Sequence, residues 1–293
     1  MNKYIFVCGT SRTGTTLMVT ILDSHRNISM GYELPTYINK PPNFITDVLN
    51  LCISKFNNNS KECYKCAKNK GHDLLGKLII KAQLSSVSPK ELSTLCLKFH
   101  NKGYRNLNNK DAQFHLAKDI VDLKCKKEKN KITGFKIATG NIAPYYEMMP
   151  NGYYICMIRD PRDVFSSLKA NNFPKKIKDF TKSWNSLINN YTKFNDTYPT
   201  QNYLMKYENL VSSPDKELTL LFDNLELDYR KEVNHFFKSK ASIHKYGGNM
   251  NVKNLKKNFF KTSISRWKKE LSSKEIKIIE NTCGENMKKF NYL

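Results

Sequence analysis

The chain has 293 residues, 40% of them apolar, and 49 Lys and Arg against 26 Asp and Glu give it a formal charge of +23. A chain of this length and apolar content can form the core of one large α/β domain, or of one domain with an insert. The charge favours anionic partners such as nucleotides, nucleic acid, acidic polymers or anionic lipid, although biased base composition in the gene would produce the same richness in Lys and Asn.

The eight cysteines form no paired framework, which excludes a disulfide-rich secreted scaffold. The first apolar run is too short for a signal-peptide core, and no stretch reaches the length of a membrane span. We therefore expect a cytoplasmic, mostly reduced protein. The oligomeric state cannot be deduced from the sequence.

In chain order, five apolar runs rich in β-branched and aromatic residues predict buried strands. They are Tyr4–Cys8, Ile28–Gly31, Ile132–Ile137, Tyr153–Ile158 and Tyr203–Tyr207. Helix-like stretches separate them, beginning with Thr15–Ser24, and this alternation is typical of a parallel sheet covered on both faces. The predicted fold class is α/β, a P-loop-type parallel sheet flanked by helices, with all of residues 1–293 in one domain.

Residues 39–131 differ from the rest in being rich in Lys and Asn. Helical patterns at Ile45–Phe56, Leu74–Leu84 and Pro89–Phe99 predict a helical insert over the carboxyl edge of the sheet, where α/β proteins bind ligands. Towards the C-terminus, Asp215 and Glu217 mark the first turn of a helix, and Ser273 is placed as the cap of another.

The first motif is "KYIFVCGTSRTGTTLM", Lys3 to Met18, in which a strand, a glycine loop and a helix follow one another. Such a loop stabilises an anion at the helix N-terminus. Gly14 permits close approach, and Thr15 and Thr16 add hydroxyl donors. The ATP-binding pattern needs Lys at position 15, so the cation of this loop is Arg12 instead and ATP–Mg²⁺ chemistry is disfavoured.

The second motif, "YYICMIRDPRDVFSSLKANN", is again strand, turn and helix. Asp160 suits a helix N-cap and Pro161 the first helical position. Arg159 then lies at the carboxyl end of the strand, and Ser167 lies two turns along the helix on the face of its start. An arginine and a hydroxyl converging there would bind a second phosphate.

The two motifs together resemble the sulfotransferases that use 3′-phosphoadenosine-5′-phosphosulfate (PAPS), and most closely the tyrosylprotein sulfotransferase branch and its bacterial relatives. "GTSRTGTTL" is similar to their 5′-phosphosulfate loop and "RDPRDVFSSL" to their 3′-phosphate segment. "RTGTTLMVTILDSHRNISMGYELP" follows that branch almost position by position. The likeness extends to "MKYENLVSSP" and "SRWKKEL" and is absent from residues 39–131.

The resemblance implies a role for particular residues. Glu33 in "GYELP" corresponds to the catalytic base, although the branch has a glutamate pair where this chain has Tyr32–Glu33. Lys136 corresponds to the lysine on the transferring sulfonate, and Arg12 to the cation on the departing phosphate. His25 falls where these families show a structural histidine. The implied nucleotide-binding residues are Arg12, Thr13, Gly14, Thr15, Thr16, Arg159, Ser167, Tyr207 near the adenine and Arg266 on the 3′-phosphate.

What the resemblance implies is a metal-free transfer of a sulfonate from PAPS, leaving 3′-phosphoadenosine-5′-phosphate (PAP), to a hydroxyl or amine acceptor. The acceptor, whether small molecule, sugar or peptide, is expected in the insert. The alternatives are a P-loop nucleotide kinase, which lacks its lysine, and a basic nucleic-acid-binding protein, for which the usual motifs are absent. The segment "CYKC", with Cys63 and Cys66 near Cys52 and His72, leaves a zinc site, a local disulfide and plain thiols open.

Overall fold

The computed structural model of the protein describes residues 3–34, 40–105, 110–137, 141–173, 176–229, 231–239, 241–246 and 253–293. Its internal contacts divide the chain into two compact units. Unit 1 comprises Met1–Ile5, Val19–Ile137 and His235–Lys256, and unit 2 comprises Phe6–Met18, Ala138–Asn234 and Lys257–Leu293. The assignment of residues 1–293 to one domain stays a prediction, and each unit is described by itself.

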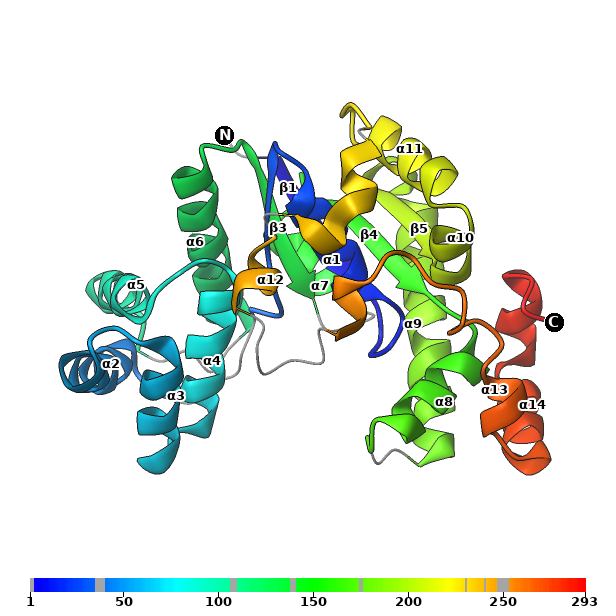
Figure 1. Ribbon diagram of the computed structural model, residues 1–293, viewed down its shortest axis with the longest axis horizontal. Coiled ribbons are helices and arrows are strands. Elements are labelled where there is room, and N and C mark those ends of the chain that lie inside the picture. The colour runs from blue at the N-terminus through cyan, green and yellow to red at the C-terminus, as the bar shows by residue number, and fades with distance from the viewer. Residues whose placement is uncertain are drawn as a thin grey trace. The chain divides into compact units, whose positions relative to one another are not determined.

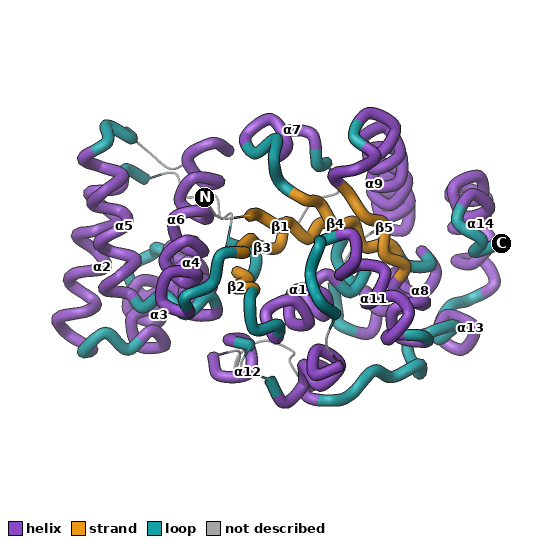
Figure 2. Tube along the Cα trace, turned by 90° about the horizontal axis from the view of Figure 1, so that it is seen from above, coloured by secondary structure: helices purple, strands orange, loops and turns teal. Residues whose placement is uncertain are grey.

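The strands form one five-stranded sheet in the order β2-β3-β1-β4-β5, drawn in orange in Figure 2. Their bounds are β1 Lys3–Cys8, β2 Ile28–Gly31, β3 Ile132–Ile137, β4 Tyr153–Ile158 and β5 Asn202–Lys206. The β2–β3 and β4–β5 pairs are parallel, and every residue of β2, β3 and β4 is buried. Complete burial is typical of a parallel sheet with helices on both faces, so the predicted α/β class is confirmed. β5 ends one residue earlier than predicted, since Tyr207 begins the next helix.

Most helices of unit 1 lie within residues 40–131, the region predicted as a helical insert. Their bounds are α2 Pro42–Phe56, α3 Ser60–Asn69, α4 Asp73–Leu84, α5 Pro89–Asn101, α6 Lys110–Glu128 and α12 Ser242–Tyr246, with a 3₁₀ turn η3 at Lys253–Lys256. α6 packs against β2 and β3, whereas α2 packs against α3 and α5, and α3 against α4 (Figure 1). The three predicted helices of this region are present, and α3 and α6 are additional. Residue 39 and residues 106–109 of the predicted insert lie outside the described residues.

Local signals fix how the insert helices begin. Pro42 opens α2, the side chain of Asn59 accepts from the first N–H groups of α3, and Ser88 and Glu91 form a capping box at α5. Asn57 and Asn58, both in the left-handed conformation that asparagine tolerates, turn the chain between α2 and α3. α2 and α3 therefore form a tight helical hairpin.

A buried ion pair links distant segments of unit 1. Lys124 on α6 and Asp23 on α1 lie 2.5 Å apart, with side-chain exposures of 0% and 2%. Lys124 also donates to the carbonyl of Met30 at 2.8 Å and to the hydroxyl of Ser242 at 3.0 Å. The remaining oxygen of Asp23 accepts from Ser242 N–H at 2.9 Å. A buried pair is tolerated when further hydrogen bonds satisfy it in this way.

The helices of unit 2 surround β4 and β5. Their bounds are α7 Ala143–Met148, α8 Pro161–Ala170, α9 Ile177–Thr197, α10 Tyr207–Ser212, α11 Pro214–Asn224, α13 Trp267–Glu270 and α14 Ser273–Lys289, with η1 at Pro199–Gln201. Three described elements are divided between the units: β1, α1 Thr15–Ser24 and the 3₁₀ segment η2 Lys231–Lys238.

The helix starts of unit 2 agree with the sequence at two of three predicted places. Asp160 caps α8, and Asp215 and Glu217 stand in the first turn of α11. The predicted cap Ser273 is wrong by one residue, because Ser272 forms the capping box with Glu275 and Ser273 is the first helical residue. Among the described helices, none has both the length and the apolar composition for crossing a bilayer.

Candidate active site

The loop between β1 and α1 in unit 2 is shaped by glycine. Gly9 has φ +149° and Gly14 has φ +93°, and a Cβ on Gly14 would come within 2.6 Å of the Tyr207 ring. Thr13 turns its hydroxyl inward and donates to the carbonyl of Thr10 at 2.8 Å. The loop leads directly into α1 at Thr15, whose opening N–H groups have no partners within the helix. This is the arrangement in which helix N-termini bind anions.

Arg159 is placed beside this loop by the register of the sheet. Ile158, the last residue of β4, pairs with Lys206, the last residue of β5, so Arg159 and Tyr207 follow side by side. The guanidinium lies 4.5 Å from the centroid of the Tyr207 ring. It donates to the carbonyl of Arg12 at 3.1 Å and to that of Ser263 at 2.6 Å.

The backbone of Arg159 is held by a hydrogen bond from α9. Its carbonyl accepts from Nε1 of Trp184, a fully buried side chain of α9, at 3.1 Å. The Tyr207 hydroxyl meets the Ser263 hydroxyl at 2.8 Å. Tyr207 and Ser263, which both contact the Arg159 guanidinium, thus hold each other in place.

Arg12 lies near Arg159, in the same part of unit 2. Its backbone is left-handed, with φ 71°, and its Nε donates to the Ser167 hydroxyl on α8 at 2.9 Å. Burial, and then the positive charges of Arg159 and Arg266, lower the pKa of the Arg12 guanidinium. The charges of Arg159 and Arg266 thus disfavour the charged form of Arg12, and an anion bound beside Arg12 would offset this effect.

Two buried polar atoms in this region have no hydrogen-bond partner among the described residues. They are the hydroxyl of Thr10, in the loop, and Nε of Arg159. Buried donors are nearly always satisfied in folded proteins, so such atoms mark a place where a ligand or water completes the bonding. An unsatisfied hydroxyl and an unsatisfied guanidinium N–H fit a phosphate-bearing nucleotide.

Arg266 belongs to a segment held against α8. Asp163 of α8 accepts from the backbone N–H groups of Ser265 at 2.8 Å and Trp267 at 3.1 Å. The Arg266 Nε donates to the two Glu270 carboxylate oxygens at 3.0 and 2.9 Å. Arg266 is therefore ion-paired, and its charge reaches Arg12 across the site. No local pattern in the sequence indicates this anchoring role of Asp163.

Glu33 and Lys136 meet in unit 1. β2 and β3 pair in parallel with Gly31 opposite Phe135, so residues that follow the two strands emerge at one edge. The Lys136 ammonium forms an ion pair with the Glu33 carboxylate. Glu33 is also left-handed, with φ 49°. Arg12 has a left-handed backbone as well, but so do other residues outside the site, such as Ser86 and Lys129.

A residue not foreseen from the sequence, Lys81 on α4, also acts on Glu33. The Lys81 carbonyl accepts from the Ser85 hydroxyl at 3.1 Å, and that hydroxyl accepts from Tyr32 N–H at 3.3 Å, which places this end of α4 beside Glu33. Burial raises the pKa of the Glu33 carboxyl, but the charge and hydrogen bond of Lys136, with the charge of Lys81, outweigh it and hold the pKa below its ordinary value. Burial lowers the pKa of the Lys81 ammonium. The Glu33 carboxylate raises this pKa and the Lys136 ammonium lowers it, and the net result is a pKa below the ordinary value.

His25 is buried at the end of α1, where its Nδ1 accepts from Asn27 N–H at 3.2 Å. This placement suits the structural role expected from the sequence. Among the described residues, no group of three or more His, Cys, Asp or Glu side chains is arranged to hold a metal ion. His72, a candidate ligand in "CYKC" and its surroundings, packs its ring edge-on against Phe44 instead.

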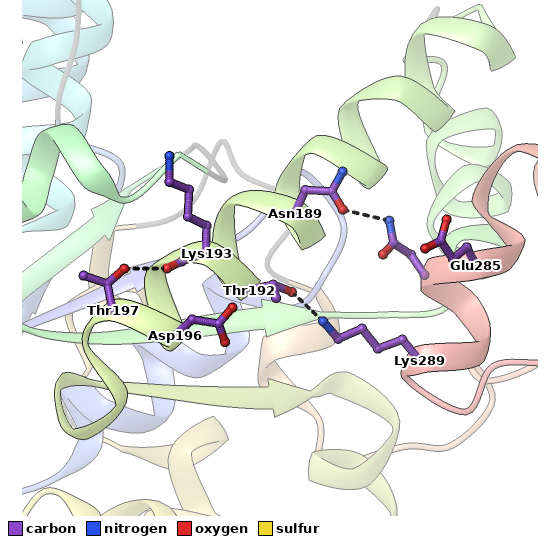
Figure 3. Close-up of a pocket in the computed structure, with 8 residues that line it drawn as sticks. Asn189, Thr192, Lys193, Asp196, Thr197, Glu285 and Lys289 are labelled. Atoms are coloured by element: carbon purple, nitrogen blue, oxygen red, sulfur yellow. Dashed lines mark hydrogen bonds between the residues drawn. The ribbon is translucent and has the colours of Figure 1, made fainter.

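Two cavities lie apart from the predicted residues. In unit 2, side chains of α9 and α14 line a cavity of about 450 Å³, and Figure 3 shows Thr192 of α9 and Lys289 of α14 turned toward one another. Thr192 accepts from Lys289 at 3.1 Å, and Asn189 from Asn286 at 3.2 Å. In unit 1, a smaller cavity of about 230 Å³ lies between the starts of α2 and α4, with Phe44 and Leu75 among its apolar lining.

With this geometry described, comparison with known proteins decides the family. Residues 4–231 match the family described as "Sulfotransferase family". The chain belongs to the sulfotransferase family. The resemblance seen in the two phosphate motifs, and the expectation of a sulfotransferase enzyme, are confirmed.

The relatives of this sulfotransferase are distant. It is 23% identical over 242 residues to a Caenorhabditis briggsae protein named "Putative protein-tyrosine sulfotransferase", covering 80% of this chain and 69% of that one. It is 23% identical over 275 residues to an "Uncharacterized protein" of Aquifex aeolicus, covering 90% of this chain but 30% of that protein. Among solved structures it resembles the sulfotransferase domain from the curacin biosynthetic pathway, with a TM-score of 0.61 and 15% identity over 97% of this chain and 98% of that one. That likeness shows the sulfotransferase fold.

Proposed function

We propose that the protein transfers a sulfonate group from PAPS to a hydroxyl or amine acceptor by in-line displacement. The observation that supports this most directly is the convergence of Arg12, Arg159 and the charge of Arg266 at a glycine loop that opens a helix. PAPS carries a 5′-phosphosulfate and a 3′-phosphate, so it matches both the loop and the second group of donors. No metal ion is needed in this account.

In the proposed complex the loop holds the 5′-phosphosulfate. The N–H groups of Gly14, Thr15 and Thr16 and the inward-braced Thr13 form the cradle, and the Thr10 hydroxyl completes its bonding on the phosphate.

A second group of residues holds the 3′-phosphate. Arg159 and Ser167 bind it, with Arg266 as a further cation. Tyr207 braces the Arg159 guanidinium and lies near the adenine.

The chemistry is a displacement at sulfur. The acceptor oxygen or nitrogen attacks the sulfur, the bond from sulfur to the phosphate oxygen breaks, and Glu33 takes the acceptor proton. Lys136 and Arg12 stabilise the charge that spreads over the sulfonate and collects on the departing PAP. Because the pKa of Glu33 is held low by Lys136, the carboxylate is ionised at neutral pH. When Lys136 turns to the sulfonate it no longer lowers that pKa, and the carboxylate becomes the stronger base that proton transfer requires.

The acceptor is bound by the insert in this proposal. The apolar cavity at the starts of α2 and α4 would take an uncharged part of the acceptor, because its lining includes Phe44, Ile45 and Leu75. The name of the nematode relative brings a tyrosine-bearing peptide into the set of acceptors to try, beside sugars and small phenols.

The rival functions make different demands. A nucleotide kinase would need Lys at position 15, where the chain has Thr15, and would bind ATP only with Mg²⁺. A nucleic-acid-binding protein built on the +23 charge would bind DNA in a steeply salt-dependent way and would ignore PAP.

The proposal is tested by thermal unfolding with PAP, AMP or ATP in the presence of a chelator. PAP at one hundred times its Kd should stabilise the native state by about 2.7 kcal/mol. For a domain of this size that is on the order of 5–10 °C in Tm. Equal stabilisation by AMP would refute the roles of Arg159 and Ser167, and a strict need for Mg²⁺ would refute the metal-free loop.

A further inference from the structure

The α2–α3 hairpin brings thiols together. Cys52 lies on α2 before the Asn57–Asn58 turn and Cys66 lies on α3 after it, at comparable distances along the two helices. The Cys52 and Cys66 sulfur atoms face each other across the hairpin, 2.6 Å apart. Cys63, one turn before Cys66 on α3, is the third thiol of the group.

Accessibility separates Cys66 from every other thiol of the chain. Seven of the eight cysteines are buried, and Cys66 is the one of intermediate exposure. A dissolved reagent therefore meets Cys66 first. Cys52 has no exposed surface.

The protonation of the buried partners follows from their surroundings. Burial, with the hydrogen bond and charge of Cys66, raises the pKa of Cys52 to about 12. Burial and the charge of Cys66 raise the pKa of Cys63 to about 11. Both thiols are protonated at neutral pH, so neither initiates thiol chemistry in the reduced protein.

We propose that Cys52 and Cys66 are the two halves of a reversible disulfide that joins α2 to α3 when the protein meets a small-molecule disulfide. In the first step the Cys66 thiolate attacks one sulfur of the reagent, forms a mixed disulfide and releases one reagent thiol. In the second step Cys52, losing its proton, attacks the Cys66 sulfur and releases the second reagent thiol. The two protein thiols are oxidised, and the reagent disulfide is reduced to two thiols.

Cys63 is the competing partner, because it lies at i, i+3 from Cys66 on the same face of α3. Cys52 is favoured over it because its sulfur is already in contact with that of Cys66, from the neighbouring helix. The cross-link closes the short segment between Cys52 and Cys66, and a closed segment of about 15 residues is expected to stabilise a native state measurably. Oxidation should therefore raise Tm, and reduction should reverse the rise.

The experiment uses the full chain, reduced and freed of reductant. Brief native alkylation with iodoacetamide should label Cys66 alone. Incubation of unlabelled protein with oxidised glutathione should lower the intact mass by two hydrogen atoms, and a non-reducing peptide map should contain the Cys52–Cys66 cross-link. This map needs no variant, so it decides the matter even if a substitution prevents folding.

Variants then identify the resolving thiol. Cys52→Ser should leave Cys66 as a persistent glutathione adduct and abolish the rise in Tm on oxidation. Cys96→Ser, which removes an equally buried thiol of α5, should behave as the wild type. A wild-type protein that keeps the glutathione adduct, or that yields a Cys63–Cys66 link in its place, would overturn the proposal.

Discussion

Replacing Arg12 by glycine should separate nucleotide binding from folding. The backbone of Arg12 has φ 71°, a conformation that costs a non-glycine residue about 1 kcal/mol and costs glycine almost nothing. The substitution removes the hydrogen bond to Ser167, which involves a charged group and is worth about 1.5–3 kcal/mol. It also removes a cation repelled by Arg159 and Arg266. These effects oppose one another, so the free energy of unfolding should fall by no more than about 2 kcal/mol.

Binding should suffer much more. In the proposed site Arg12 makes a charge-assisted hydrogen bond to the 5′-phosphate, and losing it costs about 1.5–3 kcal/mol. That corresponds to an increase of about 10- to 150-fold in the Kd of PAP.

The assay is titration calorimetry with PAP, beside urea unfolding of the protein without ligand. Arg26→Gly, which removes an exposed arginine, is the matched control and should leave the Kd unchanged. PAP binding to Arg12→Gly as tightly as to the wild type would refute the placing of the phosphosulfate at this loop.

Three further predictions concern the base, its surroundings and the loop. Glu33→Gln should leave the Kd of PAP nearly unchanged and lower single-turnover sulfonate transfer by about 10²- to 10⁴-fold; retained turnover would mean that the base lies elsewhere. Lys81→Met should raise the pKa of the Glu33 carboxyl, because a cation that favours its ionised form is gone; carbon-13 NMR titration of labelled glutamate, assigned with Glu33→Gln, measures this. Since that pKa is lowered in the folded protein, the ion pair with Lys136 contributes stability above the unfolded pKa, and the contribution is lost as the pH falls through the folded pKa. Gly14→Ala should weaken PAP binding and lower Tm, because the new Cβ meets the Tyr207 ring at φ +93°; a Tm equal to that of the wild type would contradict the contact.

The strands could be predicted almost to the residue because they are short, continuous apolar runs, as expected for a sheet buried on both faces. Their register then explains why Arg159 lies beside Tyr207, which no local pattern contains. The cap Ser273 was missed by one position because two serines stand together, although Glu275 three residues after Ser272 marks the capping box.

The insert was harder to predict. α3 is short, and most of its residues are polar. α6 buries apolar residues on more than one side, and the buried face of α3 consists of the small residues Ser60, Cys63 and Ala67, so neither helix shows a row of large apolar residues in the sequence. The contact of Lys81 with the surroundings of Glu33 depends on how α4 packs against β2, and Lys81 in the sequence is one lysine among many. The sequence predicts Arg12 and Ser167 as members of two separate phosphate motifs, but it does not predict the hydrogen bond between them.

The central claim is tested most directly by following the sulfonate itself. The protein is incubated with PAPS labelled in its sulfonate, a chelator, and pools of phenols, sugars, amines and tyrosine peptides. The account predicts that an acceptor gains the label and the mass of one sulfonate while an equal amount of PAP appears, and that Glu33→Gln suppresses this transfer. Label that remains on PAPS with every pool, in a protein that also fails to bind PAP, would contradict it.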